Sequence, residues 1–413
     1  MTYTRSIFVT NNGLTDHIGV AQVLPYLEAL SSRGHKIAVL SVERPDQQDL
    51  YRTEIAPRLA RAGIVHSPIL RHRSSLAGKL ERFAMPSLLL SRLDGLVTAF
   101  RPDVLHCRSY MPLGAVLQVS QRRAVPFVFD MRGFWVDERC ESGIWRGPVG
   151  RSYALHFRRL ETQALAKASA VITLTEDARE LVAARASYNN CPIEVIPCSV
   201  DQTRFAPDRA LRQSWRKQLG FGIHDVVLAH LGSAGPLYRI DATYRLTAAL
   251  RAQGVRSKLL LIGDHRAKDH IDAANGHGIT LGDNEILCRQ VPHQDVPSLL
   301  NAADLGLSFR VTKPSSLGAS ATKVGEYLSC GLPVISNAGI GDIHRVVPDP
   351  AIGLVLDGLS DADLQAAATK IATARFASRS TIRDRVAGRF DLDAACDRYD
   401  GVYQSFAQRK QAA

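Results

Sequence analysis

The sequence predicts an α/β protein with two Rossmann-like domains in series. Short apolar segments alternate with amphipathic segments of helical period, which is typical of parallel sheets covered by helices. The alternation pauses near residues 197–207 and then starts again, which indicates a second unit. A length of 413 residues also agrees with two domains. We place the first domain at 1–200, the second at 201–390 and a C-terminal segment at 391–413.

The expected strands and helices follow from the period of the apolar residues. In the first unit, strands are predicted at 6–10, 36–41, 104–107, 127–130, 170–175 and 193–196, and helices at 20–33, 83–99, 112–120, 150–168 and 176–185. In the second unit, strands are predicted at 226–231, 258–262, 305–309 and 334–336, and helices at 241–252, 296–303 and 322–330. Only helical patterns follow, from about 361 to 408. Because ligands bind beyond the carboxyl ends of parallel strands, the loops after the strands are the places to look for function, and two such sheets facing each other would form a cleft.

Composition restricts the class of protein. No apolar run approaches the ~18 residues that a membrane span needs, and the N-terminal segment is too polar for a signal peptide. The seven cysteines form no CxxC pair and no zinc-type cluster, so we expect a reduced, cytoplasmic protein without a metal. The formal charge of +11 is compatible with anionic partners or with ordinary solubility charge. No nucleic-acid-binding module is recognisable, so nucleic acid is not an expected partner.

The loop after the first strand, residues 11–19, contains Gly13 and Gly19 and leads into a helix. Free amide groups at such a helix start can face a phosphate or a sugar, and we take Gly19 as a donor-binding candidate. The spacing is not GxGxxG, so a dinucleotide site is not supported. A plain strand-to-helix turn is an equal alternative.

The loop after residues 127–130 is rich in polar side chains. Asp130 and Arg132 can orient a sugar or its acceptor, and we take them as catalytic candidates. Asp137, Glu138 and the ring of Trp135 are candidates for acceptor binding. The alternative is a network of salt bridges within the loop.

A second glycine-bearing loop opens the second unit. Gly232 and Ser233 follow the strand at 226–231, and Arg239 precedes the helix that Asp241 could begin. Small residues, free amides and one cation suit a diphosphate, so Gly232, Ser233 and Arg239 are donor-binding candidates.

The most informative segment is 314–335. Ser320 or Thr322 can cap a helix, and Lys323 then lies in its first turn, where a cation opposes the helix dipole. That placement makes sense if an anion such as a nucleotide diphosphate binds there. Glu326 shares a face with Lys323 and can accept both ribose hydroxyls, while Gly331 ends the helix. The alternative is a surface Lys–Glu pair.

Residues 69–90 mix cations with large apolar side chains. Such a segment can lie on an anionic membrane and receive a lipid-linked acceptor. An ordinary amphipathic helix with its loop explains the pattern equally well, and a soluble acceptor remains open.

Together, segments 6–41, 193–201, 231–241, 321–335 and 337–342 resemble the retaining glycosyltransferases of group 1, family 4. The resemblance implies a GT-B fold in which the second domain holds the nucleotide-sugar donor and the C-terminal helix packs back on the first domain. It implies Glu326 on the donor ribose, and we take Glu326 as a catalytic as well as a donor-binding candidate. It also implies a cation near the diphosphate, which Lys323 and Arg239 match. It implies no metal or other cofactor.

The sequence departs from the family pattern at two places. The acid that usually lies eight positions before Glu326, on the transferred sugar, is Gly318 here, and backbone amides around 317–320 can take its place. The family's His-Asp pair is also absent, and Asp130-Met-Arg132 occupies that position. These differences leave the identity of the sugar open.

The expected activity is transfer of a sugar, with retention, from a nucleotide diphosphate sugar to a glycan or lipid-linked acceptor in cell-envelope or polysaccharide biosynthesis. A GT-B nucleotide-sugar epimerase is one alternative, and a non-catalytic binder of nucleotide sugar or glycan is another. We expect a cytoplasmic protein, with peripheral contact at the inner face of the membrane as an option.

Overall fold

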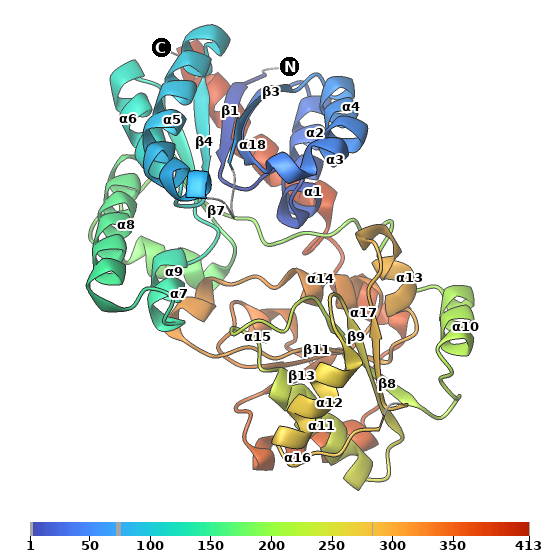
Figure 1. Cartoon of the computed structure of the whole chain (residues 1–413). Helices are drawn as coiled ribbons and strands as arrows, with labels where there is room; N and C mark the ends of the chain where they lie inside the picture. Colours follow the sequence, from blue (N-terminus) through green and yellow to red (C-terminus); the bar gives the residue numbers. More distant parts are fainter. Residues whose placement is uncertain (1–2, 72–75, 283, 413) are drawn as a thin grey trace. The chain divides into compact units, whose positions relative to one another are not determined.

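The computed structural model describes residues 3–71, 76–282 and 284–412, and it divides the chain into two compact units. Unit 1 comprises Met1–Pro197 and Leu392–Ala413, and unit 2 comprises Cys198–Asp391. Each unit is an α/β structure with its own sheet, and the units are described separately below (Figure 1).

The unit 1 sheet has seven parallel strands in the order β3-β2-β1-β4-β5-β6-β7. Their bounds are β1 (Arg5–Thr10), β2 (Lys36–Glu43), β3 (Val65–Leu70), β4 (Val104–Arg108), β5 (Phe127–Asp130), β6 (Ala170–Thr173) and β7 (Ile193–Val195). Successive side chains point to opposite faces, so Ile7 and Val9 enter one core and Phe8 enters the other. Both faces are therefore buried, as apolar parallel strands require.

Helices cover the two faces of this sheet. The core containing Ile7 is closed by α5 (Leu76–Phe100), α6 (Leu113–Arg123), α8 (Gly147–Lys167) and α9 (Glu176–Ala183). The core containing Phe8 is closed by α1 (His17–Gln22), α2 (Leu24–Ser32), α4 (Ala56–Arg61) and α18 (Leu392–Ala412). Short helices η1 (Pro45–Gln47), α3 (Gln48–Leu50) and η2 (Tyr51–Ile55) follow β2, and α7 (Trp135–Glu141) follows β5.

The last helix, α18, belongs to unit 1 although it follows unit 2 in the chain (Figure 1). It packs against α2, and Tyr399, Tyr403 and Cys396 are buried in the unit 1 core. The Thr4 hydroxyl donates a hydrogen bond to the Tyr403 carbonyl at 2.7 Å. The return of the C-terminal helix onto the first domain, implied by the family resemblance, is confirmed.

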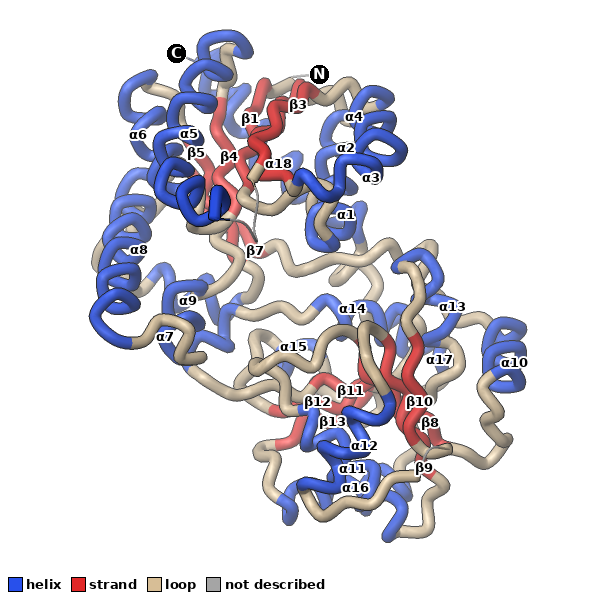
Figure 2. Tube along the Cα trace, in the orientation of Figure 1, coloured by secondary structure: helices blue, strands red, loops and turns tan. Residues whose placement is uncertain are grey.

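The unit 2 sheet has six parallel strands in the order β10-β9-β8-β11-β12-β13 (Figure 2). Their bounds are β8 (Val226–Leu231), β9 (Ser257–Ile262), β10 (Ile286–Arg289), β11 (Leu305–Ser308), β12 (Val334–Asn337) and β13 (Gly353–Leu356). Leu228 faces the core of α11 (Ile240–Ala252), α12 (Ala267–Gly276) and α16 (Asp361–Thr373). Val227 and Ala229 face the core of α13 (Val296–Leu300), α14 (Thr322–Ser329), α15 (Ile343–Val346) and α17 (Arg379–Arg385). Three further helices are α10 (Arg209–Gln218), η3 (His293–Asp295) and η4 (Pro314–Gly318).

The prediction of one continuous helix at 20–33 is wrong in its continuity: the segment is helical, but it is divided into two helices that meet at Val23, and the first begins at His17. Val23 leaves helical geometry, with φ −124° and ψ −60°. Pro25 has no N–H to donate to the carbonyl of Ala21, and its ring crowds that carbonyl, so a continuous helix cannot pass this point.

Three strands were not predicted, and each lies at an edge of its sheet: β3, β10 and β13. Edge strands carry half-exposed side chains, so their apolar pattern is weak. β3 even contains Pro68, which an edge strand tolerates because one of its sides forms no ladder. The segment 69–90 therefore begins in β3 and continues into α5, and its residues 72–75 lie outside the described part of the chain.

Among the described residues, no helix has the length and apolar character that crossing a bilayer requires.

Candidate functional site

The first feature of the site in unit 2 is a buried cation. Lys323 lies in the first turn of α14 and is only 7% exposed. Its ammonium has no hydrogen-bond partner among the described residues. The pKa of Lys323 is lowered to about 7, first because burial disfavours the charged form and second because Arg310 is nearby. A buried amine without a hydrogen bond to any described residue is costly, so its presence indicates a place for an anion.

A second cation and an aromatic ring complete this cluster. The Lys323 ammonium lies 4.2 Å from the centre of the Tyr238 ring, and the guanidinium carbon of Arg310 lies 5.3 Å from the same centre. Such contacts with a ring face stabilise a cation. Arg310 was missed in the sequence, although its place two residues after the end of β11 is a signal that could have found it.

The loop after β8 approaches the ammonium closely. Gly232 has φ +92°, which favours glycine, and a Cβ added there would lie 3.8 Å from the Lys323 Nζ. The neighbouring Ser233 is exposed, and its carbonyl accepts a hydrogen bond from His230 Nε2 at 3.3 Å. The structure thus brings the predicted Gly232 and Lys323 together.

A chain of hydrogen bonds supports Gly232 from behind. His265 Nε2 donates to the Gly232 carbonyl at 2.7 Å, so its Nδ1 must accept, and His270 Nε2 donates to it at 3.0 Å. The Tyr244 hydroxyl then donates to His270 Nδ1. This directional chain requires neutral imidazoles. Burial lowers the pKa of His265 and, to about 4, that of His270.

Glu326 lies one turn after Lys323 on α14 and is also buried. Its negative charge acts to raise the pKa of Lys323, opposite to burial and Arg310. The two residues are therefore not an exposed surface pair, because both side chains lie inside the protein.

Arg239 faces a different place. Its guanidinium pairs with the carboxylate of Asp241 through two hydrogen bonds of 2.8 Å each. Together with Arg245 and Asp361, these residues line a separate pocket of unit 2. The cation that shares the Tyr238 ring with Lys323 is Arg310, so we transfer the proposed diphosphate role from Arg239 to Arg310.

The start of α14 differs from the expectation. Its N-cap is Ala321, with no side-chain cap, so the prediction of Ser320 or Thr322 as a capping residue is wrong. The Ser320 hydroxyl instead accepts a hydrogen bond from the Cys198 amide at 3.1 Å. Near Gly318, the Ala319 amide donates to the Ser316 carbonyl at 3.1 Å, so this amide is already used within the loop.

In unit 1, Asp130 lies at the centre of a buried polar cluster. Its carboxylate is fully buried and contacts His106 at 3.4 Å, Arg108 at 3.3 Å and Arg132 at 4.0 Å. The Tyr399 hydroxyl of α18 donates to it at 3.4 Å. Burial alone would raise the pKa of Asp130, but the surrounding positive charges lower it. Asp130 is thus placed to position the two arginines, and its own catalytic role stays a prediction.

The other candidates after β5 lie on α7. The ring of Trp135 stacks on Tyr110 at 5.6 Å and meets Trp145 and Phe157 edge-on at 5.0 Å each. Asp137 forms an ion pair with Arg158 at 3.0 Å. Glu138 lies in the first turn of the same helix and is partly buried. Trp135 therefore contributes to an aromatic cluster in unit 1.

Gly19 has a packing reason to be glycine. A Cβ at this position would lie 2.0 Å from the Gly13 carbonyl oxygen, so any side chain would push the loop away from α1. Gly19 is buried beneath that loop.

In the part of the chain that the structure describes, no group of three or more His, Cys, Asp or Glu side chains could hold a metal ion.

Comparison with known proteins agrees with this architecture. Residues 19–199 match the family described as a glycosyl transferase 4-like domain. The D-inositol 3-phosphate glycosyltransferase of Actinosynnema mirum is 29% identical over 52% of this chain and 51% of its own. The 2-deoxystreptamine N-acetyl-D-glucosaminyltransferase of Streptomyces fradiae is 25% identical over 90% of this chain and 87% of its own. The chain spans only about half the length of the first of these relatives.

Solved structures share the fold across nearly the whole chain. Sucrose-phosphate synthase from Thermosynechococcus elongatus has a TM-score of 0.73 at 15% identity, covering 99% of this chain and 100% of its own. Anabaena HepE in complex with UDP-glucose has a TM-score of 0.68 at 16% identity, covering 99% and 100%. The fold is the GT-B fold of glycosyltransferases. The chain resembles the group 1, family 4 members of that class.

Proposed function

We propose that this protein is a glycosyltransferase that moves a sugar, with retention, from a nucleotide diphosphate sugar to a glycan or lipid-linked acceptor. Cell-envelope or polysaccharide biosynthesis is the proposed context, on the cytoplasmic side of the membrane. The observation that carries the proposal is the buried ammonium of Lys323, which forms no hydrogen bond with any described residue and lies beside Arg310 at the carboxyl edge of the unit 2 sheet.

A diphosphate is the ligand that this cluster suits best. Two cations share the ring of Tyr238, and α14 directs its N-terminal amides toward the same region. Glu326, one turn further along α14, is the proposed partner of the donor ribose. Protein cations and amides can neutralise the leaving diphosphate, so no metal is part of the proposal.

The related proteins support this choice of substrate class. Two of them are named as transferases of sugars, and HepE was solved with UDP and with UDP-glucose. A uridine nucleotide is therefore the first donor to test.

In the proposed reaction, the bond between the anomeric carbon and the diphosphate oxygen breaks, and the diphosphate leaves with the electron pair. The acceptor oxygen bonds to the same carbon and its proton is released to the diphosphate or to water. Lys323 and Arg310 stabilise the charge on the diphosphate. Arg132, held by Asp130, is proposed to orient the acceptor or the sugar, and Asp137, Glu138 and Trp135 stay candidates for acceptor binding.

The test is calorimetric titration with UDP, GDP, ADP and dTDP, followed by incubation with the corresponding nucleotide sugar and analysis of the products. We expect tight binding of one nucleoside diphosphate, and its release from the sugar once acceptor is added. An isomerised nucleotide sugar would identify an epimerase instead. Binding without turnover under any acceptor would favour a non-catalytic protein, and no binding at all would refute the donor site.

A further inference from the structure

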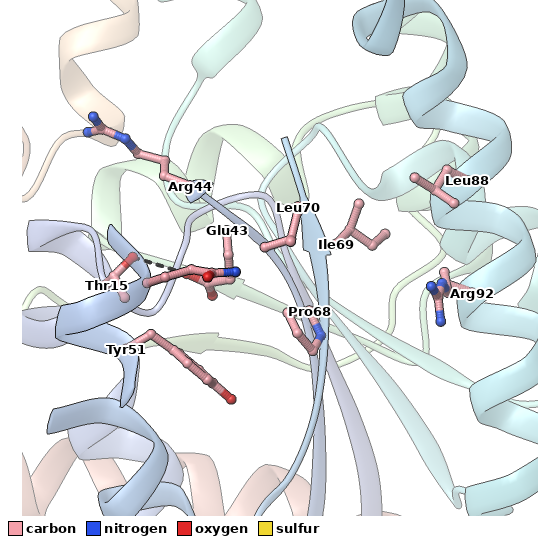
Figure 3. Close-up of a pocket in the computed structure, with 10 residues that line it drawn as sticks. Thr15, Glu43, Arg44, Tyr51, Pro68, Ile69, Leu70, Leu88 and Arg92 are labelled. Atoms are coloured by element: carbon pink, nitrogen blue, oxygen red, sulfur yellow. Dashed lines mark hydrogen bonds between the residues drawn. The ribbon is translucent and has the colours of Figure 1, made fainter. Parts of the chain in front are cut away.

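Unit 1 contains a pocket of about 430 Å³ at the carboxyl edge of its sheet (Figure 3). Its lining comes from the ends of β2 and β3, the loop after β1, the short helices after β2 and the helix α5. This volume lies within the range of ~300–1,000 Å³ that is usual for small-molecule sites. The carboxyl edge is also where open α/β sheets bind ligands. The pocket is thus both large enough and correctly placed for a substrate.

The polar side of the pocket is built around Glu43, which is only 4% exposed. Its carboxylate accepts hydrogen bonds from the Leu14 amide at 2.8 Å and from the Thr15 hydroxyl at 3.1 Å, and the Ser41 hydroxyl also donates to it. These bonds tie the loop after β1 to the end of β2. The pocket wall is therefore preformed, because its buried charge already has its partners.

A second set of hydrogen bonds fixes the neighbouring tyrosine. The Tyr51 hydroxyl donates to His66 Nδ1 at 2.9 Å, and His66 Nε2 donates to the Ser41 hydroxyl oxygen at 2.8 Å. This arrangement requires a neutral imidazole, and burial lowers the pKa of His66 although Glu43 opposes the shift. Tyr51 thus presents a fixed ring to the pocket.

The opposite side is apolar and open. Ile69 and Leu70 of β3 and Leu88 of α5 line it. Ile69 is only 3% exposed, whereas Leu70 is 47% and Leu88 39% exposed. Large apolar side chains left exposed around a concave site mark a binding surface more often than isolated ones do. An apolar chain can cover them.

Two arginines lie at the pocket, and they differ in their partners (Figure 3). Arg44 is paired with Asp46, whose charge offsets it. Arg92 is exposed on α5 and forms no ion pair with any described residue. In Figure 3 it lies on the side of Leu88 and Ile69, away from Thr15 and Glu43. The uncompensated positive charge is therefore at the apolar end of the pocket, away from the buried carboxylate.

We infer that this pocket binds the acceptor, and that the acceptor is an amphiphile with a phosphate group held by Arg92 and an apolar chain lying on Leu70 and Leu88. The inference rests on the proposed transferase function, because it names the substrate class of the same enzyme. Hydroxyl groups of the acceptor face the polar side formed by Thr15 and Glu43. Cationic and apolar groups side by side are the combination that an anionic amphiphile requires.

The experiment is calorimetric titration of the full chain with dodecyl phosphate below its micelle concentration. Dodecyl maltoside tests the apolar part alone, and inorganic phosphate tests the anion alone. We expect dodecyl phosphate to bind most tightly. Arg92→Gln should weaken the binding of dodecyl phosphate by about tenfold. The same variant should change the affinity for dodecyl maltoside by less than about twofold. Leu88→Ser should weaken both amphiphiles by similar factors.

Arg151→Gln is the matched control, because Arg151 is an exposed arginine of α8 that does not line the pocket. If Arg92→Gln and Arg151→Gln change the affinity for dodecyl phosphate equally, the inference is overturned. It is also overturned if dodecyl phosphate does not bind. Inorganic phosphate binding as tightly as dodecyl phosphate would refute the amphiphile. A UDP titration of the same preparation keeps the two proposals distinguishable. If UDP binds and dodecyl phosphate does not, only the acceptor inference fails; if neither binds, both fail.

Discussion

The ammonium of Lys323 lies 4.2 Å from the centre of the Tyr238 ring, on which the guanidinium of Arg310 also lies. The ring attracts each cation, but it cannot remove the repulsion between them. Burial first, and that repulsion second, lower the pKa of Lys323 to about 7. An anion bound between the two cations would offset both their repulsion and the cost of burying the ammonium. The first three predictions follow from this.

Lys323→Met should weaken UDP binding by about 30-fold or more, while uridine binding changes by less than about twofold, because the lost contact is with the diphosphate. The same variant should raise Tm, by roughly 2 to 4 °C for each kcal/mol gained, because a buried unpartnered amine is removed. Calorimetry and thermal unfolding measure the two effects. Lys217→Met, an exposed lysine of α10, is the control and should change neither. Equal loss of UDP and uridine binding would remove Lys323 from the phosphate site.

UDP affinity should fall as pH rises above 7. The pKa of free Lys323 is about 7, so at pH 8 most of the amine is neutral, and an anion must bind together with a proton. The affinity should fall by up to about tenfold for each pH unit above 7. His230 and His265 do not contribute in this range, because burial lowers the pKa of each below its usual value.

Titrations between pH 6.5 and 9 in two buffers of different ionisation enthalpy measure the proton uptake directly. In Lys323→Met, UDP affinity should no longer fall as pH rises above 7. An affinity that stays constant from pH 7 to 9 in the wild type contradicts the assignment.

Arg310→Gln should have two separable effects. It should weaken UDP binding by about tenfold, because one cation is lost. It should also shift the pH midpoint of UDP binding upward, because Arg310 lowers the pKa of Lys323 and its removal lets that pKa rise. Arg239→Gln is the comparison, since Arg239 is paired with Asp241 and faces another pocket. If Arg239→Gln weakens binding more than Arg310→Gln does, the reassignment is wrong.

Several residues of the Lys323 cluster in unit 2 could be identified from the sequence, because the signals for them lie in the sequence nearby. Lys323, Glu326 and Gly232 occupy positions whose meaning depends on the helix start or strand end nearby. Arg310 was missed because its role depends on Tyr238, which comes near it through an isolated antiparallel bridge between the two residues. Arg239 stays a prediction, and the structure adds that its charge is paired with Asp241, only two residues away.

His265→Phe should disturb the loop after β8. It removes the donor to the Gly232 carbonyl, which would cost about 1 to 2 kcal/mol of unfolding free energy. UDP binding should weaken as well, because Gly232 lies beside Lys323. Tyr244→Phe is the control, because Tyr244 lies at the far end of this series of hydrogen bonds, and it should weaken UDP binding less. Nitrogen chemical shifts at pH 7 should show His265 protonated on Nε2 only. Protonation on Nδ1 would contradict the assigned directions of these hydrogen bonds.

Asp130→Asn should destabilise the protein by about 3 kcal/mol, because it leaves Arg108 and Arg132 buried near a site that has lost its charge. Asp137→Asn removes a half-exposed ion pair with Arg158 and should cost less than about 1 kcal/mol. Urea unfolding of the two variants gives the comparison. Equal destabilisation would show that Asp130 does not hold the cluster together.

The unit 1 site was harder to predict for a physical reason. Asp130, Arg132 and Trp135 form a polar, aromatic pattern that reads as a ligand loop. In the structure, Asp130 ends β5 and Trp135 begins α7, and residues from distant segments contact them: Tyr399 contacts Asp130 and Tyr110 stacks on Trp135. The sequence carries no local sign of those partners. The pocket at Glu43 was missed for the same reason, since its wall is assembled from edge strand β3 and helix α5.

The position of α18 has a consequence for biosynthesis on the ribosome. Unit 2 is one uninterrupted segment, so every residue of its core has been synthesised before α18 is made. Unit 1 starts first and is finished last, because Tyr399, Tyr403 and Phe406 fill its interior beside Phe8 and Val39. During synthesis, the core face of unit 1 that contains Phe8 therefore stays uncovered until α18 has been translated. In that period, the exposed apolar side chains are a binding site for chaperones.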